Sequence, residues 1–219
     1  MRRKMLLPQT DNWEYNLVDL GLTSGTLWMD RNIGASSPED YRPFFAWGET
    51  QCYTANEVGT KKNFDWNDYK YANGASDKLT KYCNDSSYGN DGFTDNLIEL
   101  ELSDDAAYGY TNGKCKIPTK AQFQELIDET DYTWTTQNGV NGGLFTSKTN
   151  GNSIFVPAAG ACSYGSQYYV GEVGFLWSSS LDESYHGNAW GLVFDNGVVS
   201  FDYYEYARYE GLSVRGVKV

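Results

Sequence analysis

Residues 119–129 carry the clearest secondary-structure pattern in the chain. Phe123, Leu126 and Ile127 recur at the spacing that places side chains on one face of a helix. Thr119 begins a T-x-x-Q capping box, in which two side chains satisfy free backbone N–H groups at the helix start. We therefore expect an amphipathic helix over this range.

Short apolar runs separated by turn residues predict strands. Two of them flank a Thr-Ser-Gly turn within residues 17–34, and the others follow residue 140. Asp195-Asn-Gly197 is typical of a tight hairpin turn. The later strands are expected at residues 154–157, 174–178, 189–194, 198–201 and 212–219.

Two further segments have the pattern of a helix start. Ser37-Pro-Glu-Asp40 offers a capping hydroxyl, a proline suited to the first helical position and two acids favoured by the helix dipole. Residues 103–108 show a shorter version of this pattern. Residues 50–100 have a loop composition, and so long a loop in a compact domain folds on itself or serves function.

Alternation in the later strands separates two faces. Trp190, Leu192 and Phe194 share a face of core type, whereas Val193 and Asp195 lie on the opposite face. The same alternation continues through residues 198–202. We expect the second face to point outward.

The composition is that of a globular protein. The chain has 219 residues, of which 40% are hydrophobic and 16% aromatic, so it can bury a core. No repeat and no linker interrupts it. We expect one α+β domain over residues 17–219, preceded by an N-terminal extension over residues 1–16.

The net charge of −12 restricts the partners. No basic stripe is present to neutralise phosphates, so we expect no nucleic-acid partner, and an anionic membrane surface is disfavoured as well. No apolar run approaches the roughly 20 residues of a membrane span, and only three apolar residues follow the basic start. We expect neither membrane insertion nor a signal peptide in this chain.

Metal and disulfide chemistry have weak support. Cys52, Cys83, Cys115 and Cys162 contain no C-x-x-C pair for zinc; free thiols are the simpler interpretation and two disulfides the alternative. Residues 84–95 are rich in the oxygen ligands that calcium takes, but they lack EF-hand spacing. We expect no cofactor, with calcium as the open alternative.

Catalytic chemistry has few candidates. His186 is the single histidine, so a serine triad would depend on it, and no G-x-S-x-G motif is present. Asp104 and Asp105 could form an acid–base pair, but adjacent acids at a helix start are more simply caps. We expect no enzyme activity.

Tyrosine gathers near the C-terminus. Tyr203, Tyr204, Tyr206 and Tyr209 lie within seven residues among charged side chains. No single periodicity buries them all, and tyrosine is the rigid, amphipathic contact residue of many binding loops. The cluster indicates a ligand-binding surface, with packing of one or two rings on the core as the alternative.

Nine short motifs recur in an order typical of one protein family. They are Val18-Asp-Leu-Gly-Leu-x-Ser-Gly-Thr-Leu-Trp28, Asn32-Ile-Gly-Ala35, Pro38-Glu-Asp-Tyr41, Phe45-Ala-Trp-Gly-Glu49, Asp104-Asp-Ala-Ala107, Ile117-Pro-Thr-Lys-Ala-Gln-Phe-Gln-Glu-Leu126, Pro157-Ala-Ala-Gly160, Leu176-Trp-Ser-Ser-Ser180 and Ser213-Val-Arg215. Together they resemble the Fibrobacter succinogenes major paralogous domain, common in gut Bacteroidetes, over about residues 17–219.

The resemblance implies a C-type-lectin-type fold related to formylglycine-generating enzymes, with two main helices and short antiparallel strands. Members of the family are mostly surface or secreted proteins. Some are the variable proteins of diversity-generating retroelements, including phage-borne ones, in which a segment before a Ser-Val-Arg-like strand is rewritten at adenines. The resemblance thus implies a variable region over residues 181–210. Formylglycine-generating activity would need reactive cysteines near the C-terminus, and none follows Cys162.

Adenine rewriting of Asn codons reaches Tyr, Asp, His, Ser, Val and Arg, among others, but not Trp or Glu. Residues 181–210 are dense in the reachable set, although Glu205 and Glu210 would have to be encoded otherwise. The residues expected to form the ligand surface are Tyr185, His186, Val193, Asp195, Ser200, Asp202, Tyr203, Tyr204, Tyr206, Arg208 and Tyr209.

The expected function is therefore display and ligand binding by the hypervariable protein of a diversity-generating retroelement. Its partner would be a cell-surface protein or glycan, and its place a cell surface or phage virion. The alternative is a fixed carbohydrate-binding or adhesin module of the same fold, in which Trp13, Trp66 or Trp134 stacks on sugar. The tryptophans of the family motifs (Trp28, Trp47, Trp177 and Trp190) are expected in the core.

Overall fold

The computed structural model describes residues 15–201 and 206–219. Its named strands pair antiparallel in several small sheets, and helices are few, so the fold is α+β as predicted. The helices are α1 (Ala106–Tyr110), α2 (Lys120–Glu129) and the single-turn 3-10 helices η1 (Ala55–Glu57), η2 (Asn90–Gly92) and η3 (Leu102–Asp104).

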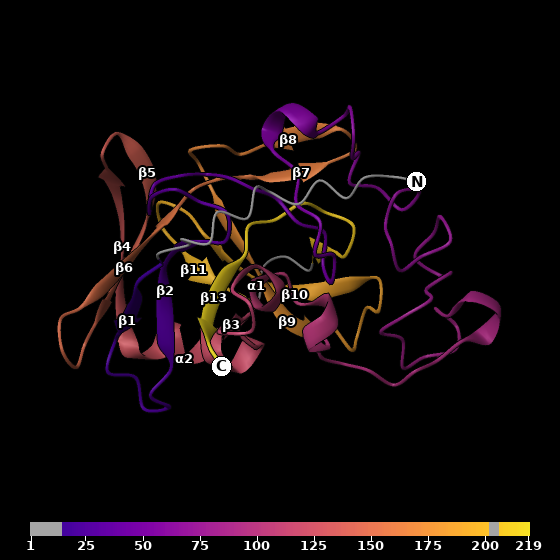
Figure 1. The fold of residues 1–219 in the computed structure, drawn as a ribbon, viewed down its shortest axis with the longest axis horizontal. Coiled ribbons are helices and arrows are strands. Elements are labelled where there is room, and N and C mark those ends of the chain that lie inside the picture. The colour runs from indigo at the N-terminus through magenta and orange to yellow at the C-terminus, as the bar shows by residue number, and fades with distance from the viewer. Residues whose placement is uncertain (1–14, 202–205) are drawn as a thin grey trace.

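Both ends of the described chain meet in one four-stranded sheet, whose order is β1–β2–β13–β3. Strands from the two ends of the chain thus share one sheet, although the sequence pattern placed most strands after residue 140. Figure 1 shows β13 beside β2 in the middle of the molecule. The strands are β1 (Leu17–Asp19), β2 (Leu27–Asn32), β13 (Arg215–Lys218) and β3 (Cys115–Lys116).

A buried arginine joins this sheet to its neighbour. The guanidinium of Arg215 donates to the side-chain oxygen of Asn32 (2.9 Å) and to the carbonyls of Met29 (3.0 Å) and Phe155 (3.1 Å). Burial lowers the pKa of Arg215 to about 9, since desolvation disfavours the charged form. The Ser-Val-Arg strand is thus fixed by its own buried polar group.

The central sheet is built on the β9–β10 pair. β10 also pairs with β11 after a hairpin turn at Asp195-Asn-Gly197, as predicted, and with β12 at its other end. The strands are β9 (Gly174–Leu181), β10 (Asn188–Phe194), β11 (Val199–Ser200) and β12 (Tyr206–Ala207).

Two hairpin systems complete the strands. The three-stranded sheet β4–β5–β6 lies at one end of the molecule, opposite the irregular loops of residues 50–100 (Figure 1). The sequence interpretation contained β6 but neither β4, β5 nor the β7–β8 hairpin. The strands are β4 (Thr130–Gln137), β5 (Val140–Ser147), β6 (Ser153–Pro157), β7 (Ala161–Ser163) and β8 (Ser166–Tyr168).

The core has two parts, one on each side of the β9–β10 pair. We call them the large cluster and the small cluster. Every residue of β9 is buried, because both of its faces are covered. The large cluster contains Phe45, Trp47, Tyr82, Trp177, Val193 and Tyr206, among others. The small cluster contains Trp28, Phe123, Phe145, Leu192 and Phe194, among others.

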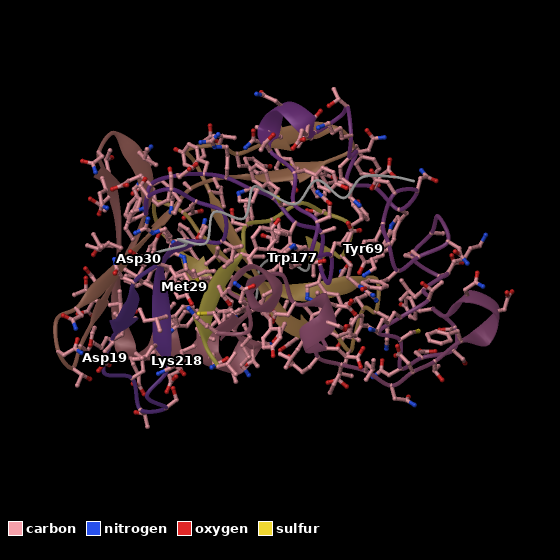
Figure 2. All side chains as sticks on the ribbon, viewed as in Figure 1. Asp19, Met29, Asp30, Tyr69, Trp177 and Lys218 are labelled. Atoms are coloured by element: carbon pink, nitrogen blue, oxygen red, sulfur yellow. The ribbon has the colours of Figure 1, made fainter. Side chains whose placement is uncertain are left out.

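Two indole groups tie the large cluster to the central sheet. Trp47 Nε1 donates to the carbonyl of Ser178 (2.8 Å), and Trp177 Nε1 donates to the carbonyl of Phe45 (2.8 Å). Figure 2 shows Trp177 in the middle of the molecule. Trp28, Trp47 and Trp177 are core residues, as predicted, whereas Trp190 is only partly buried, with the ammonium of Lys120 over its ring.

The helix starts had different outcomes. The Thr119 capping box forms as predicted: Thr119 Oγ1 accepts from Gln122 N, and Gln122 Oε1 accepts from Thr119 N. α1 begins one residue after Asp105, its N-cap. The predicted helix at residues 37–40 is wrong, because the segment is a turn in which the Asp40 carboxylate accepts the N–H and hydroxyl of Ser36.

Residues 50–100 fold on themselves, one of the two outcomes expected for so long a loop. The ammonium of Lys62 is buried and lies 2.9 Å from a carboxylate oxygen of Glu49 and 2.6 Å from the carbonyl of Asp68. The carboxylate of Asp95 accepts the N–H groups of Tyr82 and Cys83. Buried charge pairs and side chain–backbone bonds thus replace regular structure here.

Candidate ligand-binding surface

The second face of β10 is buried rather than outward. Leu192 and Phe194 enter the small cluster, as the alternation predicts. Val193, on the other face, enters the large cluster and is also buried. The prediction that Val193 points outward is therefore wrong, because two layers cover the sheet and each takes one face.

Arg208 is fully buried and is a structural residue in this arrangement. Its Nε donates to Tyr69 Oη (3.0 Å), its Nη1 to the carbonyls of Tyr82 (3.0 Å) and His186 (3.1 Å), and its Nη2 to the carbonyl of Lys81 (2.8 Å). The prediction that Arg208 faces a ligand is wrong, because these acceptors use all three guanidinium nitrogens.

Tyr206 and His186 are also buried, so neither is an exposed ligand contact, and Tyr206 follows the alternative in which one or two of the tyrosine rings pack on the core. The ring of Tyr206 packs edge-on against Phe175, with centroids 5.1 Å apart. The His186 ring stacks on Tyr88 (4.9 Å), and its Nε2 bonds to the side-chain oxygen of Asn84. The rings of Tyr206 and His186 therefore make contacts within the fold and are not displayed on the surface.

Tyr209 is buried between two aromatic rings. Trp66 lies edge-on to it at 5.0 Å and Tyr164 at 5.6 Å, and Tyr209 Oη donates to Tyr164 Oη (3.1 Å). Tyr209 was expected on the surface, but its ring instead packs beneath Tyr164, which is on the surface. Tyr164 is 69% exposed.

Tyr164 was not found by sequence reasoning. It lies with Gly165 in the two-residue turn of the β7–β8 hairpin, at φ 46°, in the left-handed region that disfavours a bulky side chain. The sequence feature that could have indicated the hairpin is Tyr164-Gly165, which lies between two short segments able to form strands. The exposed tyrosine is thus held by the hairpin on one side and by Tyr209 on the other.

The loop between β9 and β10 displays Tyr185, which is 54% exposed. The loop is shaped by Asp182, whose carboxylate accepts the N–H of Ser184 (2.8 Å) and, more weakly, that of Tyr185 (3.4 Å). A Cβ placed on Gly187 would lie 3.4 Å from the Trp66 ring, so this loop meets the same aromatic group. A chain of contacts therefore runs from Tyr164 through Tyr209 and Trp66 to this loop.

The remaining predicted surface residues divide into two groups. Asp195 and Ser200 are partly exposed, and the Asp195 carboxylate accepts the N–H groups of Gly197 and Val198, so it shapes the hairpin turn. Asp202, Tyr203 and Tyr204 lie outside the described residues, as does Trp13.

The acid-rich loop of residues 84–95 uses its oxygens internally. Asp95 accepts three backbone N–H groups, and Asp85 accepts that of Ser87. Within residues 15–201 and 206–219, no group of three or more His, Cys, Asp or Glu side chains is placed to hold a metal ion. The Asx turns expected of such a loop account for these carboxylates.

Asp104 and Asp105 have separate environments. The Asp105 carboxylate caps α1 by accepting from Tyr108 N and also accepts from Ile117 N, and burial raises its pKa to about 6. Burial also acts to raise the pKa of Asp104, but hydrogen bonds from Lys81, Tyr71 and Tyr82 outweigh it and lower that pKa to about 2. Both carboxylates have structural partners.

All four cysteines are buried free thiols. Burial raises the pKa of each thiol, that of Cys162 to about 12. The protonated thiol is a weak nucleophile and a poor metal ligand. The arrangement therefore gives none of the four the properties of a reactive cysteine.

Two further findings concern the chain as a whole. None of the helices in the described ranges is both long and apolar enough to span a bilayer. No protein-family model, curated protein or solved structure matches the chain.

Proposed function

We propose that this chain is a non-enzymatic ligand-binding protein whose contact surface includes Tyr164 and Tyr185. The single observation that carries the proposal is that Tyr164 is displayed in a strained conformation on top of Tyr209, which connects it through Trp66 to the Tyr185 loop. A bulky residue in the left-handed region costs about 1–3 kcal/mol, which asparagine or glycine would avoid at a hairpin tip. Because the side chain is 69% exposed, burial returns little of that cost.

The contacts beneath the surface favour a preformed site. Tyr209 and Trp66 hold the Tyr164 side of the surface, and Arg208 bonds the carbonyl of His186, beside the Tyr185 loop, to the carbonyl of Tyr82. A ligand would therefore immobilise few additional groups on binding, which limits the entropic cost. Rigid tyrosines over such a frame suit a protein or glycan of a cell surface as partner.

We further propose that the chain has a C-type-lectin-type fold and is the variable protein of a diversity-generating retroelement. Burial refines which residues of the 181–210 segment can vary. Exposed residues such as Tyr185 change at little cost to stability, whereas Val193, Tyr206 and Arg208 are in the core. Variation is then expected in the β9–β10 loop and in partly exposed residues such as Asp195 and Ser200.

Sequencing of the flanking DNA tests the diversification proposal. The expected result is a near copy of the 3′ end of the gene beside a reverse transcriptase, differing at adenines, with a Glu codon or a Lys codon in the copy at positions 205 and 210. A genome with neither the near copy nor a reverse transcriptase would contradict the diversification proposal and favour a binding protein of fixed sequence.

Binding is tested by screening the purified chain on arrays of glycans and cell-surface protein ectodomains. For any ligand found, Tyr164→Ala and Tyr185→Ala should each weaken binding about tenfold or more. Tyr169→Ala is a matched control, because Tyr169 is a 54% exposed tyrosine that also has a positive φ (58°) but lies after β8. Equal loss in all three variants would contradict a surface centred on Tyr164 and Tyr185.

The alternative function is a fixed carbohydrate-binding module. It is favoured by Trp66, which is partly buried against Tyr209 and Tyr69 and so can offer a ring to a sugar. In that case one reproducible glycan should bind, Trp66→Ala should abolish its binding, and Tyr185→Ala should leave it unchanged.

A further inference from the structure

Strand β4 presents a long edge that no described residue pairs with. It is matched one to one with β5 along all eight residues, from Thr130↔Ser147 to Gln137↔Val140, without a register shift. The turn is Asn138-Gly139, both at positive φ (49° and 83°), which is the geometry of a type I′ hairpin. Among residues 15–201 and 206–219, no strand and no backbone hydrogen bond occupies the other side of β4.

The hairpin geometry says which groups are unpaired. In a two-residue hairpin the residues beside the turn exchange both backbone bonds, and every second pair repeats this. Thr136, Trp134 and Tyr132 therefore direct their N–H and C=O groups away from β5. Two backbone hydrogen bonds of β5 support this assignment. The carbonyl of Asn141, opposite Thr136, accepts from the N–H of Ala158, and the N–H of Ser147, opposite Thr130, donates to the carbonyl of Asn152. These backbone groups of Asn141 and Ser147 therefore point away from β4.

The edge has few of the devices that commonly protect such strands. Natural edges are blunted by lysine, proline, bulges or short length. The sequence of β4 is Thr-Asp-Tyr-Thr-Trp-Thr-Thr-Gln, with one charge, no bulge and a majority of strand-favouring residues. In Figure 1 the β4–β6 sheet stands at one end of the molecule, far from the loops of residues 50–100.

We propose that the outer edge of β4 binds an extended cationic peptide segment of a partner as an added strand. The charge beside the edge selects this occupant. Asp131 is exposed on β4 itself, and Asp128 and Glu129 immediately precede the strand, although their carboxylates accept from Gln124 and Thr23. Lys148 is the basic side chain bonded at this end of α2, where it donates to the carbonyl of Asp128. A second copy of the chain would instead bring together two molecules of net charge −12.

The side chains on either face of β4 define the segment further. Tyr132 and Trp134 are partly buried on the small cluster, so apolar residues at alternate positions of the added strand would extend that packing. Asp131 and Thr133 are exposed on the other face, where lysine or arginine would be complementary. The segment recognised is thus one in which apolar and basic residues alternate.

The test uses a fluorescein-labelled eight-residue peptide of alternating valine and lysine, titrated into the full chain and followed by fluorescence anisotropy. Saturable binding is expected. Thr136→Pro removes an outward N–H and places a ring on the edge, so it should weaken binding about tenfold or more. Thr136→Val is the matched control, because it loses the same hydroxyl bond to Asn141 but keeps the backbone N–H, and it should bind like the parent.

A second measurement is independent of the folding of any variant. The same peptide with every backbone amide N-methylated keeps its charge and side chains but has no backbone N–H to donate on either edge, so it should not bind the unaltered chain. Equal binding of the methylated peptide, or of Thr136→Pro with unchanged circular dichroism, would overturn strand addition. Dimerisation in sedimentation that Thr136→Pro abolishes, without peptide binding, would identify a second copy as the occupant and refute the proposal.

Discussion

Replacing Arg208 by methionine tests most directly whether this residue stabilises the fold beneath the proposed binding surface. Methionine keeps an unbranched apolar stem but ends where Nε stands and has no donor, so the substitution removes the hydrogen bonds and also leaves the place of the guanidinium unfilled. Arg208 belongs to the segment that sequence reasoning assigned to ligand contact, whereas the structure buries it completely. Unfolding energetics distinguish the two roles.

The magnitude follows from the acceptors left behind. Three carbonyls, those of Lys81, Tyr82 and His186, would lose a donor in the interior. Each buried acceptor without a partner costs about 1–3 kcal/mol. No carboxylate pairs with Arg208 in the described ranges, so removing its buried charge returns part of that cost. A net loss of about 3–5 kcal/mol is expected, against a total of about 5–15 kcal/mol for a domain.

Urea unfolding followed by tryptophan fluorescence measures this loss, and one of the seven tryptophans, Trp47, has its ring 5.0 Å from Arg208 Cζ. Arg42→Met is the control, since the Arg42 side chain is 61% exposed and its ion pair with Asp40 is worth about 1 kcal/mol or less. A loss below about 1 kcal/mol for Arg208→Met would refute the structural role. Retained stability with lost ligand binding would restore the role in ligand contact.

Three further predictions concern single residues. The pKa of Asp105 in the folded chain, about 6, is higher than in the unfolded chain, so the protonated carboxyl stabilises the fold. This contribution to the unfolding free energy is complete below about pH 4 and is lost, by on the order of 2–3 kcal/mol, as the pH rises through 6. Urea unfolding at several pH values should show this slope, and Asp105→Asn should lack it. Gly174→Ala places a Cβ 1.9 Å from the Phe194 ring and should destabilise the fold by about 3 kcal/mol in thermal unfolding, whereas Gly197→Ala, whose Cβ meets nothing nearer than 3.7 Å, should not. The buried thiol of Cys162 and the other three should react with a disulfide reagent only in denaturant; fast reaction of the native chain would contradict their burial.

Local patterns in the sequence were sufficient for elements whose cause is local. α2 was predictable because its capping box and its apolar face lie within eleven residues, and the side chains of Thr119 and Gln122 bond as the motif requires. The hairpin at Asp195-Asn-Gly197 was predictable for the same reason, since the Asp195 carboxylate bonds the next turn residues. Such elements depend little on the rest of the molecule.

The β4–β5 hairpin was missed although its signal is present. Asn138-Gly139 joins two eight-residue strands, and alternating threonine and aromatic residues precede the turn.

The helix predicted at residues 37–40 does not form, for a different reason. Glu39 accepts hydrogen bonds from Gln137 and Asn138, nearly 100 residues away, and a tertiary contact of that kind overrides a weak local preference.

The error about the ligand face has a clear physical origin. Alternation identifies two faces of a strand, but not what covers each. The second face of β10 is covered by residues of the 44–82 region, more than 100 positions earlier in the chain, including Phe45 and Trp47. No local pattern in residues 188–209 could reveal that cover. Tyr185 was placed on the surface correctly because it lies in a loop beyond the strands.

If residues 181–210 are rewritten as proposed, the buried residues of that segment restrict where a ligand surface can vary. If Arg208, Tyr206 and Val193 faced a ligand, each rewriting of the segment would alter the ligand surface alone. Because they are packed in the core, rewriting them would change the frame as well, and most outcomes would lose stability. Under that proposal, a tolerant surface would combine a variable loop, such as that of Tyr185, with fixed contact residues outside the segment. Tyr164 is such a residue, since it is displayed in a strained conformation by a hairpin that lies outside residues 181–210.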